Sequence, residues 1–321
     1  MKIIYKLLFL FLLTIGYSSC DFLDIVPDEI TTEADAFKDR NAAKNFVYSC
    51  YGYLPQSNVA SGSLDLLTGD EVITAFEHET FASFPKGNYT ASSPVISYWN
   101  TFFQGLRQCY IFLENVDKVP DLTESVKTDY IAQVKFLIAY YHYQLARCYG
   151  PIILIKELPD VNASQAEYLP RTSYDECVDW ICNLLDEAAS SLPAIRTNKE
   201  DYGLATSVGA KAVKAKMLLY AASPLFNGNS SFYSNFTDKS GSQLMPLTYD
   251  PNKWVKAKTA IKEAIDLAEQ NGHALYVKQD YKIGNEDANP YPAAGPVRCL
   301  RTSLVDWDSR NPEVLLAETR S

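Results

Sequence analysis

Aromatic and acidic residues occur together in the polar stretches of this chain, where their chemistry suits a neutral ligand. Aromatic residues make up 13% of the 321 residues, and 22 residues are tyrosines. Flat rings can stack on the faces of sugars, and neighbouring carboxylates can accept hydrogen bonds from hydroxyl groups. The candidate ligand-binding residues are therefore the rings and acids of these stretches: Asp70, Glu71, Phe81, Tyr89, Tyr281, Tyr291 and Trp307.

No motif with a defined catalytic mechanism accompanies these residues. The sequence contains no phosphate-binding glycine loop, no G-x-S-x-G turn and no H-E-x-x-H motif. It has no C-x-x-C pair and its three histidines are scattered, so we expect no zinc site. Asp70 and Glu71 suit a solvated acidic loop or a loop supported by a calcium ion. We predict no catalytic residues, no metal-ligating residues and no cofactor apart from such a structural calcium ion.

A glycoside hydrolase stays open as an alternative. That reaction needs two carboxyl groups about 5 to 10 Å apart across the scissile bond. The 39 acidic residues guarantee chance candidates, and no pair among them stands out. We therefore expect a binding protein, not an enzyme.

The first residues follow the pattern of a bacterial lipoprotein signal. Lys2 and Lys6 form a basic start, an apolar run follows, and small residues precede Cys20. This order predicts a signal peptide over residues 1–19 and a lipid on Cys20, with a cleaved secretory signal as the alternative. The formal net charge of −10 argues against nucleic acid as a partner.

A long helix is expected between the polar stretches. Asp121 and Glu124 have the spacing of a capping box, and Gly150 followed by Pro151 predicts the end of the helix. Such a helix would be about 40 Å long at 1.5 Å per residue. Its apolar residues recur every three or four positions and predict one covered face: Tyr130, Val134, Leu137, Tyr141, Leu145 and Cys148.

Other helices are expected on both sides of it, in pairs. Ser173 with Glu176 predicts a second capping box. Short links imply antiparallel hairpins, which must stack because one hairpin cannot bury its apolar face alone. The fold expected is mainly α, an α-α superhelix of tetratricopeptide-like helical hairpins with long irregular ligand-binding loops. Helices are predicted over 33–54 with a break near 39, and over 96–119, 174–192, 206–222 and 250–272, and a short strand over 312–317.

Short stretches along the chain also match one protein family in order and spacing. They are Phe22-Leu23-Asp24 with Pro27, Ser97-Tyr98-Trp99, Lys135 to Tyr143, Arg147 to Pro151, Arg171 to Tyr174, Ala210 to Pro224, and Asn311 to Val314. On these residues the chain resembles the RagB/SusD family of nutrient-uptake outer-membrane lipoproteins. Two features depart from the family pattern: Ile138 stands where members often carry arginine, and members continue well beyond Ser321. We therefore expect residues 20–321 to form a SusD-like helical domain truncated at its C-terminus.

The resemblance implies a function and its partners. Members bind glycans or other nutrients, have no enzymatic activity, and cover a SusC-like TonB-dependent transporter as a lid. The expected function is capture of oligosaccharides at the cell surface and their delivery to that transporter, with the protein anchored in the outer membrane through Cys20. A helical-repeat adaptor that binds only protein is a further alternative.

Overall fold

The computed structural model describes residues 33–55, 76, 78, 80–160, 162, 164, 169–277, 311–317 and 319. Within these ranges the regular structure is helical, and β-pairing is limited to isolated bridges. The predicted mainly α fold of paired helices is confirmed. No helix in this part of the chain has both the length and the apolar composition needed to cross a membrane.

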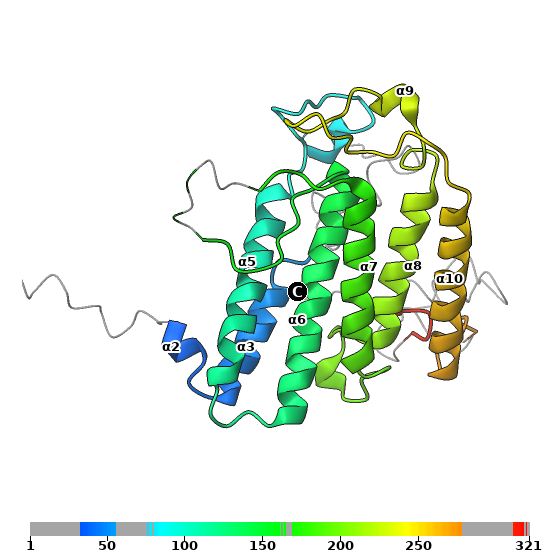
Figure 1. Cartoon of the computed structure of the whole chain (residues 1–321). Coiled ribbons are helices and arrows are strands. Elements are labelled where there is room, and N and C mark those ends of the chain that lie inside the picture. The colour runs from blue at the N-terminus through cyan, green and yellow to red at the C-terminus, as the bar shows by residue number, and fades with distance from the viewer. Residues whose placement is uncertain are drawn as a thin grey trace, which may run out of the picture.

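The main helices form a row in which chain neighbours pack against each other (Figure 1). From one side to the other they are α5 (Trp99–Asn115), α6 (Glu124–Tyr149), α7 (Tyr174–Ser191), α8 (Ser207–Ala222) and α10 (Asn252–Gln270). Before the row come α2 (Glu33–Ala36) and α3 (Arg40–Tyr51), and α3 packs on α5 and α6. The short elements are η3 (Thr80–Ser83), η4 (Val116–Lys118), η6 (Lys199–Asp201) and α9 (Ser230–Tyr233).

The connections between antiparallel neighbours gather at the two ends of the row. We call one end the loop end; it carries residues 80–98, 150–160 and 223–251 and lies at the top of Figure 1. The opposite end, the turn end, carries residues 116–123, 192–206 and 271–277. The helices hold these two sets of connections apart over their whole length.

The central helix, α6, is buried on more sides than the sequence predicts. Residues 136–146 are buried except for Tyr140, which is partly exposed. The cause is that α5 and α7 cover opposite sides of α6 and α3 covers a third. Cys148, which the sequence pattern places in the core, is exposed. The spacing is not the cause, because residues 130 and 148 are five full turns of 3.6 residues apart. Cys148 is exposed because the last turn of α6 lies beyond the covered stretch 136–146.

The interface of α8 with α10 depends on small residues. Ala215 of α8 packs with Ala260 and Ala264 of α10 in a cluster separate from the main core. Alanine side chains allow the two helix backbones to approach closely. This agrees with the alanine-rich sequence of residues 206–222.

Asp121 does not cap α6 as the sequence predicts. The N-cap residue of α6 is Thr123, and no side chain makes a capping hydrogen bond there. Asp121 Oδ1 instead accepts a hydrogen bond of 2.7 Å from the backbone N–H of Arg40, the first residue of α3. The first N–H groups of a helix have no partner inside it, so a carboxylate on an adjacent link can satisfy one of them. Asp121 therefore joins the α5–α6 link to α3.

We expect Asp121→Ala to lower the free energy of unfolding by about 1 kcal/mol, because a free N–H of α3 loses its acceptor. Asp121→Asn keeps an oxygen at the same place and should stay close to wild type. Urea unfolding of the three proteins checks this. Equal stabilities of the alanine variant and wild type would show that the bond to Arg40 contributes nothing.

Two further expectations about local structure are wrong. Ser173 occupies the N-cap position of α7, but its side chain makes no capping hydrogen bond. Residues 312–317 form turns and bends where a strand is expected. This segment lies against the end of α10, where Tyr276 N donates to Glu313 Oε1 at 2.7 Å and His273 Nδ1 lies 3.0 Å from Pro312 O. Its polar groups therefore bond to the residues that follow α10, and no strand pairs with it among the described residues.

Candidate functional site

Most of the residues predicted to bind ligand lie outside the described residues. These are Asp70, Glu71, Tyr281, Tyr291 and Trp307, together with the predicted lipidation residue Cys20. Phe81 lies in η3, but its side chain is outside the description. Tyr89 is therefore the predicted residue whose surroundings the structure describes, and the others stay predictions.

Tyr89 presents an exposed ring at the loop end. Its side chain is 52% exposed, and its ring meets Phe84 edge-on with 5.5 Å between centroids. A tight turn follows at once, because Thr90 and Ser93 exchange two backbone hydrogen bonds of 3.1 Å. The ring is thus held on one side and open to solvent on the other. This geometry suits stacking on the flat face of a ligand.

Trp99, at the start of α5, has a packing role. Tyr149 meets its ring edge-on at 5.2 Å, and the guanidinium carbon of Arg171 lies 5.4 Å from its centroid. Arg171 is itself held by a hydrogen bond of 2.7 Å from Nη1 to Pro151 O. These neighbours occupy the ring, so it closes the loop end of the core and is not an open platform. Trp99 is accordingly a partly buried residue that packs against the main core.

The turn end contains a cleft with a mixed polar and apolar lining, which no sequence motif indicates. Its volume is about 720 Å³, and it lies between α3, the start of α6 and the connection from α7 to α8. We call it the turn-end cleft. The lining residues that matter here are Lys44, Tyr48, Asp129, Tyr130, Arg196 and Asp201.

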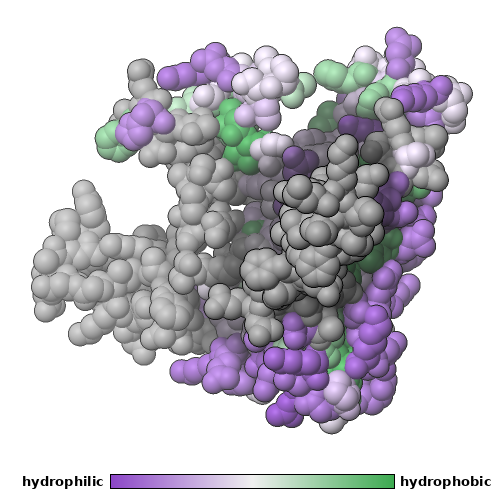
Figure 2. All heavy atoms as spheres, turned by 90° about the vertical axis from the view of Figure 1, so that its left-hand side faces the viewer, coloured by the Kyte–Doolittle hydropathy of each residue, from purple (hydrophilic) through white to green (hydrophobic). Residues whose placement is uncertain are grey.

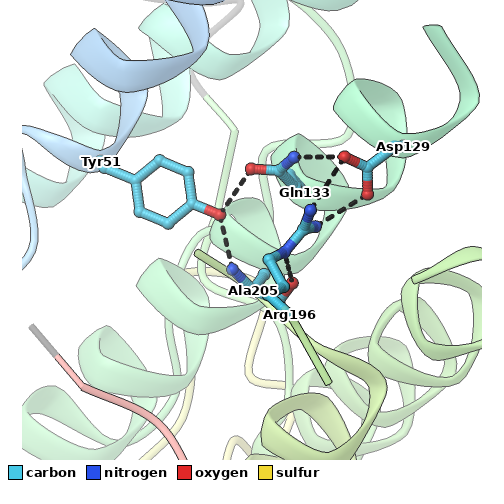
Figure 3. A network of polar contacts seen from close by, with 5 residues as sticks. All are labelled: Tyr51, Asp129, Gln133, Arg196 and Ala205. Atoms are coloured by element: carbon cyan, nitrogen blue, oxygen red, sulfur yellow. Dashed lines mark hydrogen bonds and ion pairs between the residues drawn. The ribbon is translucent and has the colours of Figure 1, made fainter. Parts of the chain in front are cut away.

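A closed ring of hydrogen bonds forms the floor of this cleft (Figure 3). Tyr51 Oη donates to Gln133 Oε1 at 3.0 Å and accepts from Ala205 N at 2.9 Å. Gln133 Nε2 donates to Asp129 Oδ2 at 2.8 Å. Arg196 binds both carboxylate oxygens of Asp129, at 2.7 and 3.1 Å, and its Nε donates to Ala205 O at 3.0 Å. The ring thereby ties α3, α6 and the α7–α8 connection together.

The ring satisfies its own polar groups and is suited to a scaffold. The side chains of Arg196 and Asp129 are only 11% and 26% exposed, so their attraction is screened less than that of a surface pair. Burial raises the pKa of Tyr51 above its usual value, which keeps its hydroxyl protonated. Both oxygens of Asp129 are already engaged. Within the described residues, no group of three His, Cys, Asp or Glu side chains is placed to hold a metal ion.

Sequence reasoning missed this cleft because its parts lie far apart along the chain. Tyr51 and Gln133 are 82 positions apart, and Tyr51 and Ala205 are 154 apart. The spacing of Asp129 and Gln133, one helical turn, is visible in the sequence but is common on helices. No pattern in the sequence assigns Arg196 to Asp129.

The chain is similar to proteins of known structure and to a curated SusD-like protein. The protein BT4246 has 35% sequence identity and a TM-score of 0.70, over 76% of this chain and 42% of that protein. The SusD-like protein BF3747 from Bacteroides fragilis has 26% identity and a TM-score of 0.50, over 61% of this chain and 37% of that one. SusD-like protein P25 from Formosa agariphila is 23% identical over 230 residues, which are 68% of this chain and 43% of the relative.

This chain therefore spans about two fifths of the length of each of these three relatives. A family model also matches residues 21–219; it is named SusD-like and described as starch-binding and associating with the outer membrane. That match extends over more than half of the chain and includes α3, α5, α6, α7 and most of α8. The chain belongs to the SusD-like family.

Proposed function

We propose that this protein captures oligosaccharides at the cell surface and delivers them to a SusC-like TonB-dependent transporter in the outer membrane. The observation that carries the proposal is the family match over residues 21–219, since the family is described by starch binding and outer-membrane association. In this proposal residues 1–19 direct secretion and a lipid on Cys20 holds the protein at the membrane.

The distribution of exposed rings supports the loop end as the place where the glycan binds. Besides Tyr89, the rings of Phe232 and Tyr249 belong to loop-end connections and are 76% and 56% exposed. Figure 2 keeps the loop end at the top and shows hydrophobic and hydrophilic side chains mixed there, whereas the described surface at the bottom is mostly hydrophilic. A mixed surface is what a sugar needs, because its ring faces are apolar and its edges carry hydroxyl groups.

Binding to a neutral glycan would use rings for stacking and nearby acids for hydrogen bonds. Tyr89 supplies a ring with one open face, and the predicted residues Phe81, Tyr281, Tyr291 and Trp307 would extend the surface. Asp70 and Glu71 would accept hydrogen bonds from hydroxyl groups. The row of helices would serve as a rigid support for these loops.

Calorimetric titration against a panel of oligosaccharides tests the proposal. We expect wild type to bind at least one glycan, and Tyr89→Ala, Tyr291→Ala and Trp307→Ala each to weaken binding about tenfold through the loss of one stacking ring. Trp254→Ala removes a ring of α10 that is 41% exposed, and it should leave binding unchanged. Undiminished binding in all three ring variants would remove these residues from the site.

The same samples separate the alternatives. Release of reducing sugar after long incubation would support a glycoside hydrolase and contradict the proposal. Co-purification with a transporter, with no binding across the whole panel, would favour an adaptor that binds only protein.

A further inference from the structure

Two tyrosine rings line the turn-end cleft from different helices. Tyr48 projects from α3 and is 37% exposed, whereas Tyr130 of α6 is partly buried. Lys44 Nζ lies over the Tyr48 ring, 5.4 Å from its centroid, so a ligand would stack on the opposite face of this ring. The cleft thus offers aromatic surface on the α3 side and a phenol group on the α6 side.

The charges around the cleft nearly cancel. Arg196 and Asp129 pair in the floor, and Lys44 and Asp201 bring one charge of each sign to the lining. Glu124 adds a third carboxylate, which is 83% exposed and lies 3.5 Å from Lys127 Nζ. A site of this composition does not favour a strongly anionic or cationic ligand. It offers donors and acceptors that match a neutral molecule rich in hydroxyl groups.

The cleft is also rigid and of suitable size. Its volume of about 720 Å³ falls within the range of about 300 to 1,000 Å³ that is usual for small-molecule sites. Its floor is held by the closed hydrogen-bond ring, so little ordering is needed when a ligand binds. Rigid aromatic and polar groups in a preformed recess are what a small polar ligand requires.

We propose that the turn-end cleft is a second carbohydrate site, which binds a neutral mono- or disaccharide unit through stacking on Tyr48 and hydrogen bonds to Asp201, Lys44 and the Tyr130 hydroxyl. The ligand class rests on the proposed function. The site does not, because the residues that line the cleft belong to the turn end, opposite the loop-end segment 80–98 (Figure 1). One glycan chain, or two, could then contact the protein at both ends.

Site-resolved NMR on the full chain tests this proposal. The protein is labelled with ¹⁵N-tyrosine, the signals of Tyr48, Tyr89 and Tyr130 are assigned from Tyr→Phe variants, and maltose, cellobiose and laminaribiose are titrated separately. We expect at least one disaccharide to shift the signals of Tyr48 and Tyr130. Shifts at Tyr89 alone would overturn the second site and leave the proposed function intact. No shift of any tyrosine signal would overturn the second site and count against glycan binding as well.

Variants distinguish stacking from indirect effects. Tyr48→Ala should weaken the response at Tyr130 about tenfold, whereas Tyr48→Phe keeps the ring and should stay within about twofold of wild type. Asp201→Asn keeps the shape of the side chain and should also weaken the response at Tyr130, because a hydrogen bond to a carboxylate is stronger than one to an amide. Tyr249→Ala removes an exposed ring at the loop end and should leave the Tyr130 response unchanged. Equal affinities of Tyr48→Ala and wild type would overturn the proposal.

Discussion

Arg196→Ala should lower the free energy of unfolding by about 3 kcal/mol, the typical cost of removing one partner of a largely buried ion pair. The variant leaves the Asp129 carboxylate with Gln133 alone, and Ala205 O loses its donor. The two hydrogen bonds of Tyr51 remain, but the hydrogen-bond ring is open, so α3 and the α7–α8 connection lose part of their link to α6. Denaturant unfolding followed by circular dichroism measures this change.

A matched control separates the ring from ordinary surface pairs. Lys262 binds Asp266 one turn along α10, and the two side chains are 73% and 44% exposed. Lys262→Ala should therefore cost no more than about 0.5 kcal/mol. If Arg196→Ala and Lys262→Ala have equal effects, the ring contributes no more than a surface contact.

The double variant tests cooperation inside the ring. Arg196→Ala combined with Asp129→Ala should cost clearly less than the sum of the single changes, since both remove the same interaction. Strictly additive losses of unfolding free energy would show that Arg196 and Asp129 do not stabilise the fold as one hydrogen-bond ring. If the cleft binds a sugar, Arg196→Ala should also weaken binding there, because Arg196 positions the floor.

Acid should destabilise the fold through His142, by about 3 kcal/mol between pH 6.5 and pH 4. The imidazole is fully buried in α6 beside Trp180, with 4.8 Å between ring centroids. Its Nε2 accepts from Ile155 N at 3.1 Å, so Nδ1 carries the proton and donates to Ile138 O at 2.8 Å. Both nitrogens of the neutral ring are therefore satisfied.

The direction of the effect follows from the pKa of His142. Burial lowers this pKa from 6.5 to about 4, against the smaller opposing effect of the bond to Ile138 O. Below pH 6.5 the unfolded chain binds a proton at His142 that the folded protein does not bind. The stabilising contribution is therefore complete above about pH 6.5, falls as the pH drops, and is lost near pH 4.

Unfolding at several pH values in this window measures the contribution. His142→Gln cannot titrate and keeps an acceptor for Ile155 N, so its stability should fall less between pH 6.5 and pH 4 than that of wild type. His78→Gln, which removes an exposed histidine, is the matched control. Identical pH dependence of His142→Gln and wild type would show that other groups cause the acid sensitivity.

Most of the helical architecture could be predicted because it depends on local properties of the chain. Asp39 marks the break between α2 and α3, and its side chain accepts from Ala42 N as an N-cap should. Thr206 caps α8 in the same way through Gly209 N. Gly150 ends α6 with a φ of 71°, a backbone conformation that glycine adopts without strain. Each of these signals acts within about four residues, so the sequence alone reveals it.

Of the candidate site, the sequence predicts kinds of residue more than positions. The position of Tyr89 in a polar stretch predicts an exposed ring, and the structure confirms this exposure. Helical periodicity predicts Cys148 in the core, and that is wrong because the neighbours of α6 do not cover the side of its last turn that carries Cys148.

By itself the sequence determined the family, the paired helices and the absence of a recognisable catalytic motif, since these depend on motifs and periodicity along the chain. Only the tertiary structure decided which residues that are distant in the sequence come into contact. In the structure Asp121 bonds to the first residue of α3 and not to the start of α6, and Tyr51 bonds to Gln133 and Ala205. The physical reason is that a polar group bonds to whichever unsatisfied partner packing brings within reach, and packing joins residues that no sequence spacing connects.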